Sequence, residues 1–465
     1  MGISSLGAGS SILTQDVLDQ LRAADETAKI APLTTKITAE NAKKNEWDVI
    51  DANMTNLIDS VTAITSIDLF DERSVTTTGT SVEVSASAGS DIQEFTLNVA
   101  NLATKQIEES GSFASENDLV GGGSAGQINL NIDGQDFTID YTDTTTLKQL
   151  KDLINQQAGD AVDATILNVG TGDARLVISS ANTGSTQDIT ITDVTGTIDS
   201  RLKAYDVATN PTGMQVLQPG IDAQFTFNNG STITRSSNEI TDLITGYTIT
   251  LKEAGETSVS VAQNTDTIIE KLNSFVSKYN DTMTELSKVT KTSTDATERG
   301  IFSNDSIIKG LQSTVRSMIE SVGGGVGSLI DYGFDIDKDG VMTFNQDTFL
   351  TALNDNPDNV QAFFNGGDFT NADTSVTTVT GAFNEIATII QSYTDYNAIL
   401  DTFKTNLTDN ISTLEARKIT EIERLDSKYE IMKKKFTAYD AMISKFNSIS
   451  SMFADMVSAQ NSSSN

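Results

Sequence analysis

Apolar residues near the C-terminus recur at alternating spacings of three and four positions over residues 422–457. This spacing places them on one face of an α-helix, which would be roughly 54 Å long at about 1.5 Å per residue. A helix with so long an apolar face needs a partner helix, in this chain or in another. The face is made by Ile422, Leu425, Tyr429, Met432, Phe436, Tyr439, Ile443, Phe446, Ser450, Phe453 and Val457.

Aromatic residues and methionine dominate this face, whereas a two-stranded coiled coil prefers Ile, Val and Leu at such positions. We therefore expect the helix to pack against several helices. An ordinary intrachain helix packed on its own core is the simpler alternative. The terminal position favours assembly, because only the polar tail 461–465 follows and terminal segments are ordered only where other contacts hold them.

The N-terminal region has the same period. A helix is predicted to begin near Thr14, with Val17, Leu18 and Leu21 on one face. Pro32 interrupts this helix or starts a new one, because proline is tolerated in the first turn of a helix. Pairing the next apolar face with the C-terminal one would bury both and place the termini together in one helical stalk. That next face is made by Trp47, Ile50, Met54, Leu57, Val61 and Ile64.

Between Arg73 and Ala262 the period changes to two, which is typical of β-strands. Asp133-Gly134 separates two alternating runs and predicts a tight hairpin. One helix is expected over residues 147–159. We interpret the region as two β-rich lobes, one inserted in the other. The alternating runs are residues 81–85, 95–99, 128–132, 137–141, 225–227 and 247–251.

Helical spacing returns after this region. Thr267 and Glu270 have capping-box spacing at the start of the next helix, and another helix is predicted over residues 307–322. A short hairpin over 332–344 precedes a helix that starts near Phe383 and runs on toward the terminal stripe. The order indicates an α+β multidomain fold, with long coiled-coil-like terminal helices, a helical-bundle domain, and β-rich head domains inserted in the middle of the chain.

We expect four structural segments. Residues 1–45 and 404–465 form a terminal helical leg that is disordered until assembled, with residues 1–12 extended or disordered. Residues 46–72 and 263–403 form a discontinuous helical domain with a small hairpin. Residues 73–109 and 206–262 form a β-rich head domain, and residues 110–205 form an inserted outer lobe with one helix.

The composition excludes several kinds of chemistry. The chain has no Cys and no His, which removes disulfides, Ser-His nucleophile pairs and the commonest zinc ligand. With 64 acidic and 31 basic residues the net charge is −33, so neither nucleic acid nor anionic lipid is an expected partner. Residues 404–445 carry nine Lys or Arg and seven Asp or Glu, so this near-neutral helix can pack against copies of itself. We expect no membrane-spanning run and no secretory signal peptide.

Residues 335–340, Asp-Ile-Asp-Lys-Asp-Gly, match the first half of an EF-hand calcium loop. The twelfth position is Gln346, which cannot supply the bidentate carboxylate, so we interpret the motif as a hairpin turned at Asp339-Gly340. The basic run 433–435 is interpreted as a solvated helix face or a site of interchain ion pairing. No catalytic, metal or cofactor site is predicted, and we expect that the chain is not an enzyme.

Several blocks taken in order resemble a known family. Residues 3–10 and 24–26, with Pro32 and Lys36 behind them, are similar to the N-terminus of the bacterial flagellar filament-capping protein family, hook-associated protein 2. Residues 240–251, Ile-Thr-Asp-Leu-Ile-Thr-Gly-Tyr-Thr-Ile-Thr-Leu, resemble its second block. The resemblance extends to residues 275–280, 337–340 and 356–364, and residues 146–184 resemble a module of hook and filament proteins. Residues 11–14 and 300–305 depart from the family pattern.

The resemblance implies a role in assembly. Such proteins leave through the flagellar type III export channel without a cleavable signal peptide. They form a ring, commonly a pentamer, at the distal tip of the extracellular filament. There they help exported flagellin fold and insert, prevent its loss, and so permit filament elongation and motility. The implied partners are further copies of the chain, flagellin, hook-filament junction proteins and an export chaperone for the C-terminal helix.

The apolar stripes give a hypothesis for the assembly contacts. We expect Leu18, Leu21, Tyr439, Phe446 and Phe453 to make them. Two alternatives stay open: a structural subunit of the filament or of the hook-filament junction, and an extracellular adhesin that binds through residues 110–205 of the head.

Overall fold

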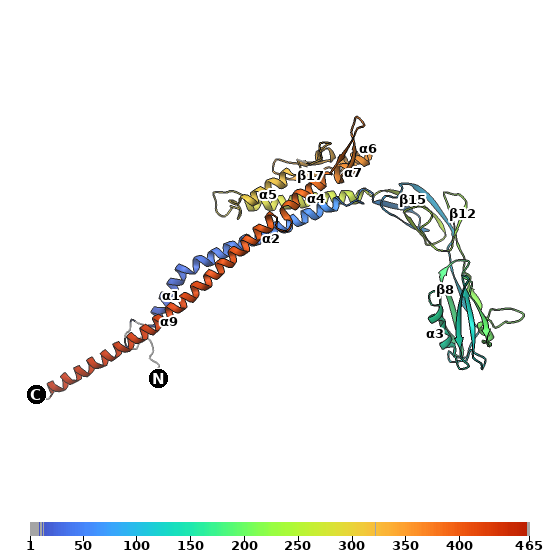
Figure 1. The fold of residues 1–465 in the computed structure, drawn as a ribbon, viewed down its shortest axis with the longest axis horizontal. Helices are drawn as coiled ribbons and strands as arrows, with labels where there is room; N and C mark the ends of the chain where they lie inside the picture. Colours follow the sequence, from blue (N-terminus) through green and yellow to red (C-terminus); the bar gives the residue numbers. More distant parts are fainter. Residues whose placement is uncertain (1–8, 10–11, 13, 321, 463–465) are drawn as a thin grey trace. The chain divides into compact units, whose positions relative to one another are not determined.

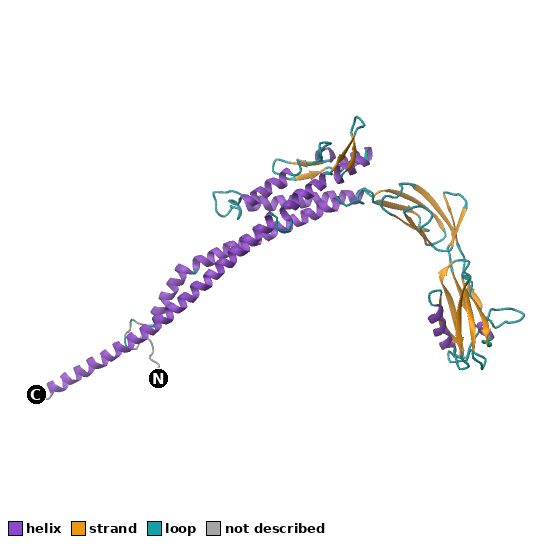
Figure 2. Cartoon of the chain, viewed as in Figure 1, coloured by secondary structure: helices purple, strands orange, loops and turns teal. Residues whose placement is uncertain are grey.

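The computed structural model describes residues 9, 12, 14–320 and 322–462, with the side chains of 461 and 462 left out (Figure 1). The chain divides into two compact units, which meet in sequence at Ser66/Ile67 and at Ile268/Ile269. The outer segments of the chain form a helical unit, and the middle forms a unit of antiparallel sheets (Figure 2). The predicted α+β fold is therefore confirmed. Most of the expected extended segment 1–12 and the end of the polar tail lie outside the described residues.

The helical unit is organised along one long helix, α9, which α1 and α2 follow (Figure 1). Thr14 caps α1, since its Oγ1 accepts a hydrogen bond from the backbone N–H of Val17. Pro32 lies in the first turn of α2, as predicted. The predicted face from Trp47 to Ile64 is fully buried. These helices are α1 (Gln15–Lys29), α2 (Ala31–Ile64) and α9 (Ile399–Ser462).

Shorter elements complete this unit around a cluster of aromatic rings. The ring centroids of Phe275 and Phe383 lie 4.9 Å apart, and those of Phe364 and Phe383 lie 5.3 Å apart. The elements are α4 (Thr265–Thr290), α5 (Ser306–Ser317), the 3-10 turn η2 (Leu329–Tyr332), β16 (Phe334–Ile336), β17 (Met342–Phe344), α6 (Gln346–Asp355), α7 (Pro357–Asn365), β18 (Gly367–Thr370), β19 (Val376–Val379) and α8 (Ala382–Thr394). The predicted hairpin is β16–β17, and Asp337 at its turn accepts hydrogen bonds from the backbone N–H groups of Asp339 and Val341.

Two predictions for this unit were wrong. Asn264 replaces the expected capping box, because its side chain accepts a hydrogen bond from the N–H of Thr267. The helix predicted from Phe383 does not run on into the terminal helix. The chain breaks between α8 and α9 at Asn397, whose φ of 62° ends any right-handed helix, and the carboxylate of Asp401 then accepts from the Asn397 N–H.

The β unit contains two hydrophobic cores. The first lies between a five-stranded sheet, in the order β1-β15-β3-β11-β12, and a three-stranded sheet, in the order β13-β14-β2. We call this part the inner lobe. Its strands are β1 (Arg73–Thr78), β2 (Val82–Ala86), β3 (Glu94–Asn101), β11 (Ala223–Phe227), β12 (Thr232–Arg235), β13 (Glu239–Ile240), β14 (Tyr247–Leu251) and β15 (Gly255–Gln263).

The second core, which we call the outer lobe, lies between the sheets β10-β4-β8-β7 and β6-β5-β9 and includes α3. Asp133 and Gly134, with φ of 50° and 72°, connect β5 to β6 in the left-handed conformation of a two-residue hairpin, as predicted. The elements are β4 (Lys105–Glu109), β5 (Gly126–Ile132), β6 (Gln135–Tyr141), α3 (Leu147–Ala158), β7 (Val162–Gly170), β8 (Asp173–Thr183), β9 (Thr190–Thr195), the 3-10 turn η1 (Ser200–Leu202) and β10 (Gln215–Gln218). The exact segment boundaries proposed above stay a prediction.

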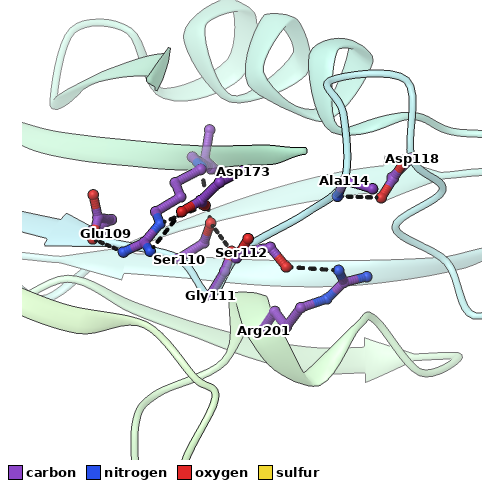
Figure 3. A network of polar contacts seen from close by, with 10 residues as sticks. Glu109, Ser110, Gly111, Ser112, Ala114, Asp118, Asp173 and Arg201 are labelled. Atoms are coloured by element: carbon purple, nitrogen blue, oxygen red, sulfur yellow. Dashed lines mark hydrogen bonds and ion pairs between the residues drawn. The ribbon is translucent and has the colours of Figure 1, made fainter. Parts of the chain in front are cut away.

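Two arginines fix the segment that leaves β4 (Figure 3). Arg175 Nη1 lies 2.7 Å from Glu109 Oε2, and its Nε lies 2.8 Å from Asp173. The hydrogen bond from Arg175 is the main cause that lowers the pKa of Asp173. Arg201 donates to the carbonyl of Ser112 at 2.9 Å and places its guanidinium 3.6 Å from the centroid of the Phe113 ring. Backbone geometry at the edge of the outer lobe is thus held by charge-assisted hydrogen bonds.

Burial alternates regularly along strand β4, but the two inward positions carry polar residues, Gln106 and Glu108. Both side chains are buried, at 4% and 6% relative exposure. Desolvation raises the pKa of Glu108 to about 7, although the hydrogen bond from Gln106 lowers it and the charge of Asp188 raises it further. Removing an ionised carboxylate from water costs more free energy than removing an uncharged amide of the same size.

None of the helices in the described part of the chain is both long enough and apolar enough to cross a membrane. Within the same residues, no group of three or more acidic side chains is arranged to hold a metal ion.

We predict that Glu108→Gln stabilises the β unit in a pH-dependent way. The folded-state pKa of Glu108 lies above the unfolded one, so the unfolded chain releases its proton first and folding stability is lost as the pH rises from about 4.5 to about 7. The gain in unfolding free energy should be on the order of 3 kcal/mol near pH 8 and small near pH 5. Calorimetric melting of the full chain at both pH values measures this. An equal gain in unfolding free energy at pH 8 and pH 5 would show that the negative charge of Glu108 is not the source of the gain.

Candidate functional site

The apolar stripe of α9 is divided into a covered part and an uncovered part. Leu425 and Tyr429 are buried, at 1% and 8% relative exposure, whereas Phe446 and Phe453 are 64% and 61% exposed. The predicted single stripe on one long helix is confirmed, but only its first part is buried within the chain. The division lies close to Asp440.

Helix α1 covers the first part. Leu18 packs against Leu425 and Tyr429. Two charged groups of α1 flank this contact: Arg22 pairs with Asp426 at 2.6 Å, and Asp25 accepts from both Lys428 and the Tyr429 hydroxyl.

The electrostatics of this contact follow from those hydrogen bonds. The bond from Lys428 is the main cause that lowers the pKa of Asp25, and the Tyr429 bond adds to it. Exposed ion pairs of this kind contribute little stability but fix the relative register of two helices.

Helix α2 covers α9 farther along. Trp47 lies at 1% exposure, and the ammonium of Lys404 lies 4.9 Å from the centroid of its ring. Lys404 also lies 3.9 Å from Asp51. The aromatic face and the carboxylate therefore hold one cation from α9 between them.

A backbone contact marks the end of the covered part. The N–H of Gly9 donates to Asp440 Oδ2 at 3.0 Å, and Asn447 Nδ2 donates to the Gly9 carbonyl at 3.1 Å. Asp440 is only 3% exposed. A Cβ at position 9 would lie 2.1 Å from the Asp440 carbonyl oxygen and 2.9 Å from the Ser444 nitrogen, so only glycine permits this approach.

Beyond Asp440 most of the apolar face is exposed in the described structure, and only Ile443 on it is half-buried. Between residues 441 and 460 the only charged side chains are Lys445 and Asp455, so this segment is neutral in a chain of net charge −33. A neutral helix that exposes large apolar side chains along one face has the character of an unpaired interface. The exposed apolar residues are Met442, Phe446, Ile449, Met452, Phe453, Met456 and Val457.

The five predicted contact residues fall into two groups. Leu18 is 3% exposed and packs against Leu425 and Tyr429 within the chain. Leu21 is 42% exposed and Tyr439 is 56% exposed, while Phe446 and Phe453 lie on the uncovered segment. A role in contacts with other chains stays a prediction for all five residues.

Sequence reasoning missed Gly9 and Asp440. The aspartate lies next to the stripe residue Tyr439 and its position in the sequence resembles that of any solvated acid. The available signal was weak: an acid inside a segment otherwise dominated by Lys and apolar residues, and a glycine in an N-terminal run of small residues.

Comparison with known proteins supports the resemblance found in the sequence. The family profile described as "Flagellar hook-associated protein 2 C-terminus" matches residues 220–448, and the one described as "Flagellar hook-associated protein 2 N-terminus" matches residues 10–106. The protein named flagellar hook-associated protein 2 from Salmonella typhimurium is 27% identical, over 99% of this chain and 99% of the relative. That of Escherichia coli K12 is 25% identical, over 97% of each.

Other relatives are longer than this chain. The match to the protein of the same name from Campylobacter jejuni, 25% identical, covers 78% of this chain but 64% of the relative, and that to a Helicobacter pylori relative, 33% identical, covers 37% of the relative. The crystal structure of the D1-D2-D3 domains of the flagellar cap protein FliD from Escherichia coli matches 78% of this chain and 99% of its own, with a TM-score of 0.61 at 23% identity. At that identity the structural likeness supports the fold.

We predict that Gly9→Ala breaks the contact between Gly9 and α9. The added Cβ cannot fit against the Asp440 backbone, and the charge-assisted hydrogen bond from the position 9 amide is lost with it. Amide exchange of the peptide that contains residue 9 should become about tenfold faster or more, as expected for the loss of a hydrogen bond to a charged group.

The matched control is Gly310→Ala in α5, where an added Cβ meets nothing within 4 Å. It should leave exchange at residue 9 unchanged and stabilise its own helix slightly. If amide exchange at residue 9 is unchanged in Gly9→Ala, the contact between Gly9 and Asp440 does not protect this amide and the prediction is wrong.

Proposed function

Since the chain belongs to the flagellar hook-associated protein 2 family, we propose that it forms the cap at the distal tip of a flagellar filament. The observation that carries this proposal is the uncovered apolar segment of α9 beyond Asp440. A segment of this kind needs partners that the described residues of a single copy do not provide.

The cap is an oligomer in this proposal. Several copies form a ring, a pentamer by the family resemblance, and their neutral helices lie against one another or against the filament. Aromatic residues and methionine suit such a contact, because their large and adaptable surfaces pack against more than one geometry. The high negative charge elsewhere in the chain keeps free copies apart until these helices meet.

The remaining partners follow from the role at the tip. Exported flagellin would fold and insert beneath the ring, which also prevents its loss, and this permits filament growth and motility. Hook-filament junction proteins would receive the first cap, and an export chaperone would cover the C-terminal helix before secretion. The protein acts outside the cell after type III export without a cleavable signal peptide.

We propose a structural role rather than catalysis. The family match is to a flagellar component. Neither the filament-subunit alternative nor the adhesin alternative gains support from a specific observation on the described residues.

Locating the protein tests the role directly. The purified full chain is added to sheared filaments of the source bacterium and detected by immunogold electron microscopy. Label at one filament end supports the cap. Label along the shaft, or filaments that lengthen with this chain, would contradict it, and so would the absence of any association.

A double substitution tests the segment that carries the proposal. Phe446→Asp with Phe453→Asp should abolish ring formation and filament growth in a deletion strain, because two carboxylates in an apolar contact cost on the order of several kcal/mol. Both residues are exposed in the single chain, so its folding should be unchanged. Ring formation is measured by analytical ultracentrifugation and growth by electron microscopy.

The control adds the same charge to the opposite face of the same helix. Ser448→Asp with Ser451→Asp should assemble normally, since both serines bond only to backbone carbonyls of their own helix. The proposal fails if the phenylalanine variant still supports full filaments.

A further inference from the structure

The outer lobe contains a cavity that the cap role does not use. Its volume is about 500 Å³. Its walls come from β4, from the segment before β9, from the segment after η1 and from β10. The lining residues are Glu108, Asp188, Ile189, Thr190, Ala204, Tyr205, Met214, Gln215 and Val216.

Glu108 is the unusual member of this lining. It lies opposite Val216 on β10 and opposite Ile178 on β8, and directly opposed residues of neighbouring strands share a face of the sheet. Ile178 belongs to the core of the lobe. Glu108 therefore occupies a position at which an apolar side chain would be ordinary, and it is only 6% exposed there.

Only one of the two carboxylate oxygens of Glu108 accepts a hydrogen bond from the described residues. Gln106 Nε2 donates to Glu108 Oε1 at 3.0 Å. Gln106 cannot turn its carbonyl toward Glu108 instead, because its Oε1 accepts from the N–H of Gly220 at 2.7 Å. Within the described part of the chain, Glu108 Oε2 has no hydrogen-bond donor. One acceptor atom of a buried anion thus remains for a ligand.

The charge of the cavity has one sign. Asp188 is a second carboxylate of the lining, and the lining contains neither Lys nor Arg. Burial raises the pKa of Glu108, which is the response of a carboxylate without a cationic partner. The rest of the wall is mostly apolar, with Ile189 and Met214 inside and the half-exposed Tyr205 and Val216 at the mouth.

These features select a class of ligand. A bare calcium ion takes six or more oxygen ligands, more than two carboxylates supply. A neutral polar molecule would leave the anion uncompensated. A primary ammonium on an aliphatic stem supplies both a charge and donors for the carboxylate and an apolar body for the walls.

We propose that this cavity binds the ammonium head of an aliphatic amine, such as the side chain of a lysine, with Glu108 as its anionic acceptor and Asp188 as a second negative charge. The stem lies against Met214 and Val216, and Tyr205 borders the mouth. The inference does not depend on the proposed cap function, because the cavity lies wholly within the outer lobe.

The test uses the full chain and n-pentylammonium, with 1-pentanol as the neutral ligand of nearly the same shape. Calorimetric titration should give one saturable site for the amine and binding of the alcohol weaker by about tenfold or more, the cost of a lost charge-assisted hydrogen bond. Glu108→Gln keeps the size of the side chain and should weaken amine binding by about the same factor.

Asp163→Asn on β7 is the matched control, because it removes one negative charge from an exposed position of the same sheet. It should leave the affinity unchanged. Thermal melting of each variant shows that it is folded. The proposal is overturned if the alcohol binds as well as the amine, if Glu108→Gln binds as well as the original chain, or if no saturable amine binding occurs.

The pH dependence gives a second readout. Pentylammonium stays charged below about pH 9, as lysine does, whereas Glu108 gains a proton as the pH falls through about 7. Affinity should therefore decrease from about pH 8 to about pH 6 and should not do so in Glu108→Gln. Asp188 and Tyr205 are the other titratable groups of the lining. A pH response that persists in Glu108→Gln would overturn the role of this residue.

The source of the amine is resolved by one more comparison. Nα-acetyl-lysine methylamide presents the same head and stem on a peptide backbone. Tighter binding of this compound than of pentylammonium assigns the site to a lysine of a partner protein. Weaker binding assigns it to a free amine, and both results support an ammonium as the ligand.

Discussion

The structure depends on the burial of one apolar face of α9 by helices from the other end of the chain. α1 and α2 do this through Leu18 and Trp47, and the flanking pairs Arg22–Asp426 and Asp25–Lys428 fix the register. The contact joins residues that are about 400 positions apart in sequence. The middle of the chain, including the β unit, therefore lies between the two helical segments that this contact brings together. The apolar cluster around Leu18 of α1 extends along α9 as far as Phe436, and Gly9 contacts Asp440 just beyond it, so the exposed part of the face begins there.

Periodicity predicted most of the architecture, because burial imposes a period of 3.6 on helices and of two on strands. The stripes of α2 and α9 and the hairpin at Asp133-Gly134 were recognisable for this reason. Features that depend on a single contact were not recognisable from the sequence. The break at Asn397 depends on one residue in a left-handed conformation, and the Gly9–Asp440 contact depends on a tertiary approach of two backbones. Glu108 was also not recognisable from the pattern, because an acidic residue in a strand is expected to be exposed and this one is buried.

Two features of the single chain carry an unfavourable free energy, for opposite reasons. The end of α9 exposes apolar side chains to water, and the outer lobe removes a carboxylate from it. Each cost is relieved by a partner of complementary character, an apolar helix for the first and a cation for the second. A chain selected only for its own stability would have few reasons to retain either.

The β unit begins and ends on neighbouring strands, with Arg73 of β1 directly opposite Gln263 of β15. The two points at which the chain enters and leaves the unit are thus clamped together by its own sheet. Residues added at a surface turn such as Asp133-Gly134 lengthen the unit without moving these two points. The size of the β unit and the geometry of its two connections to the helices are therefore set by separate parts of the chain.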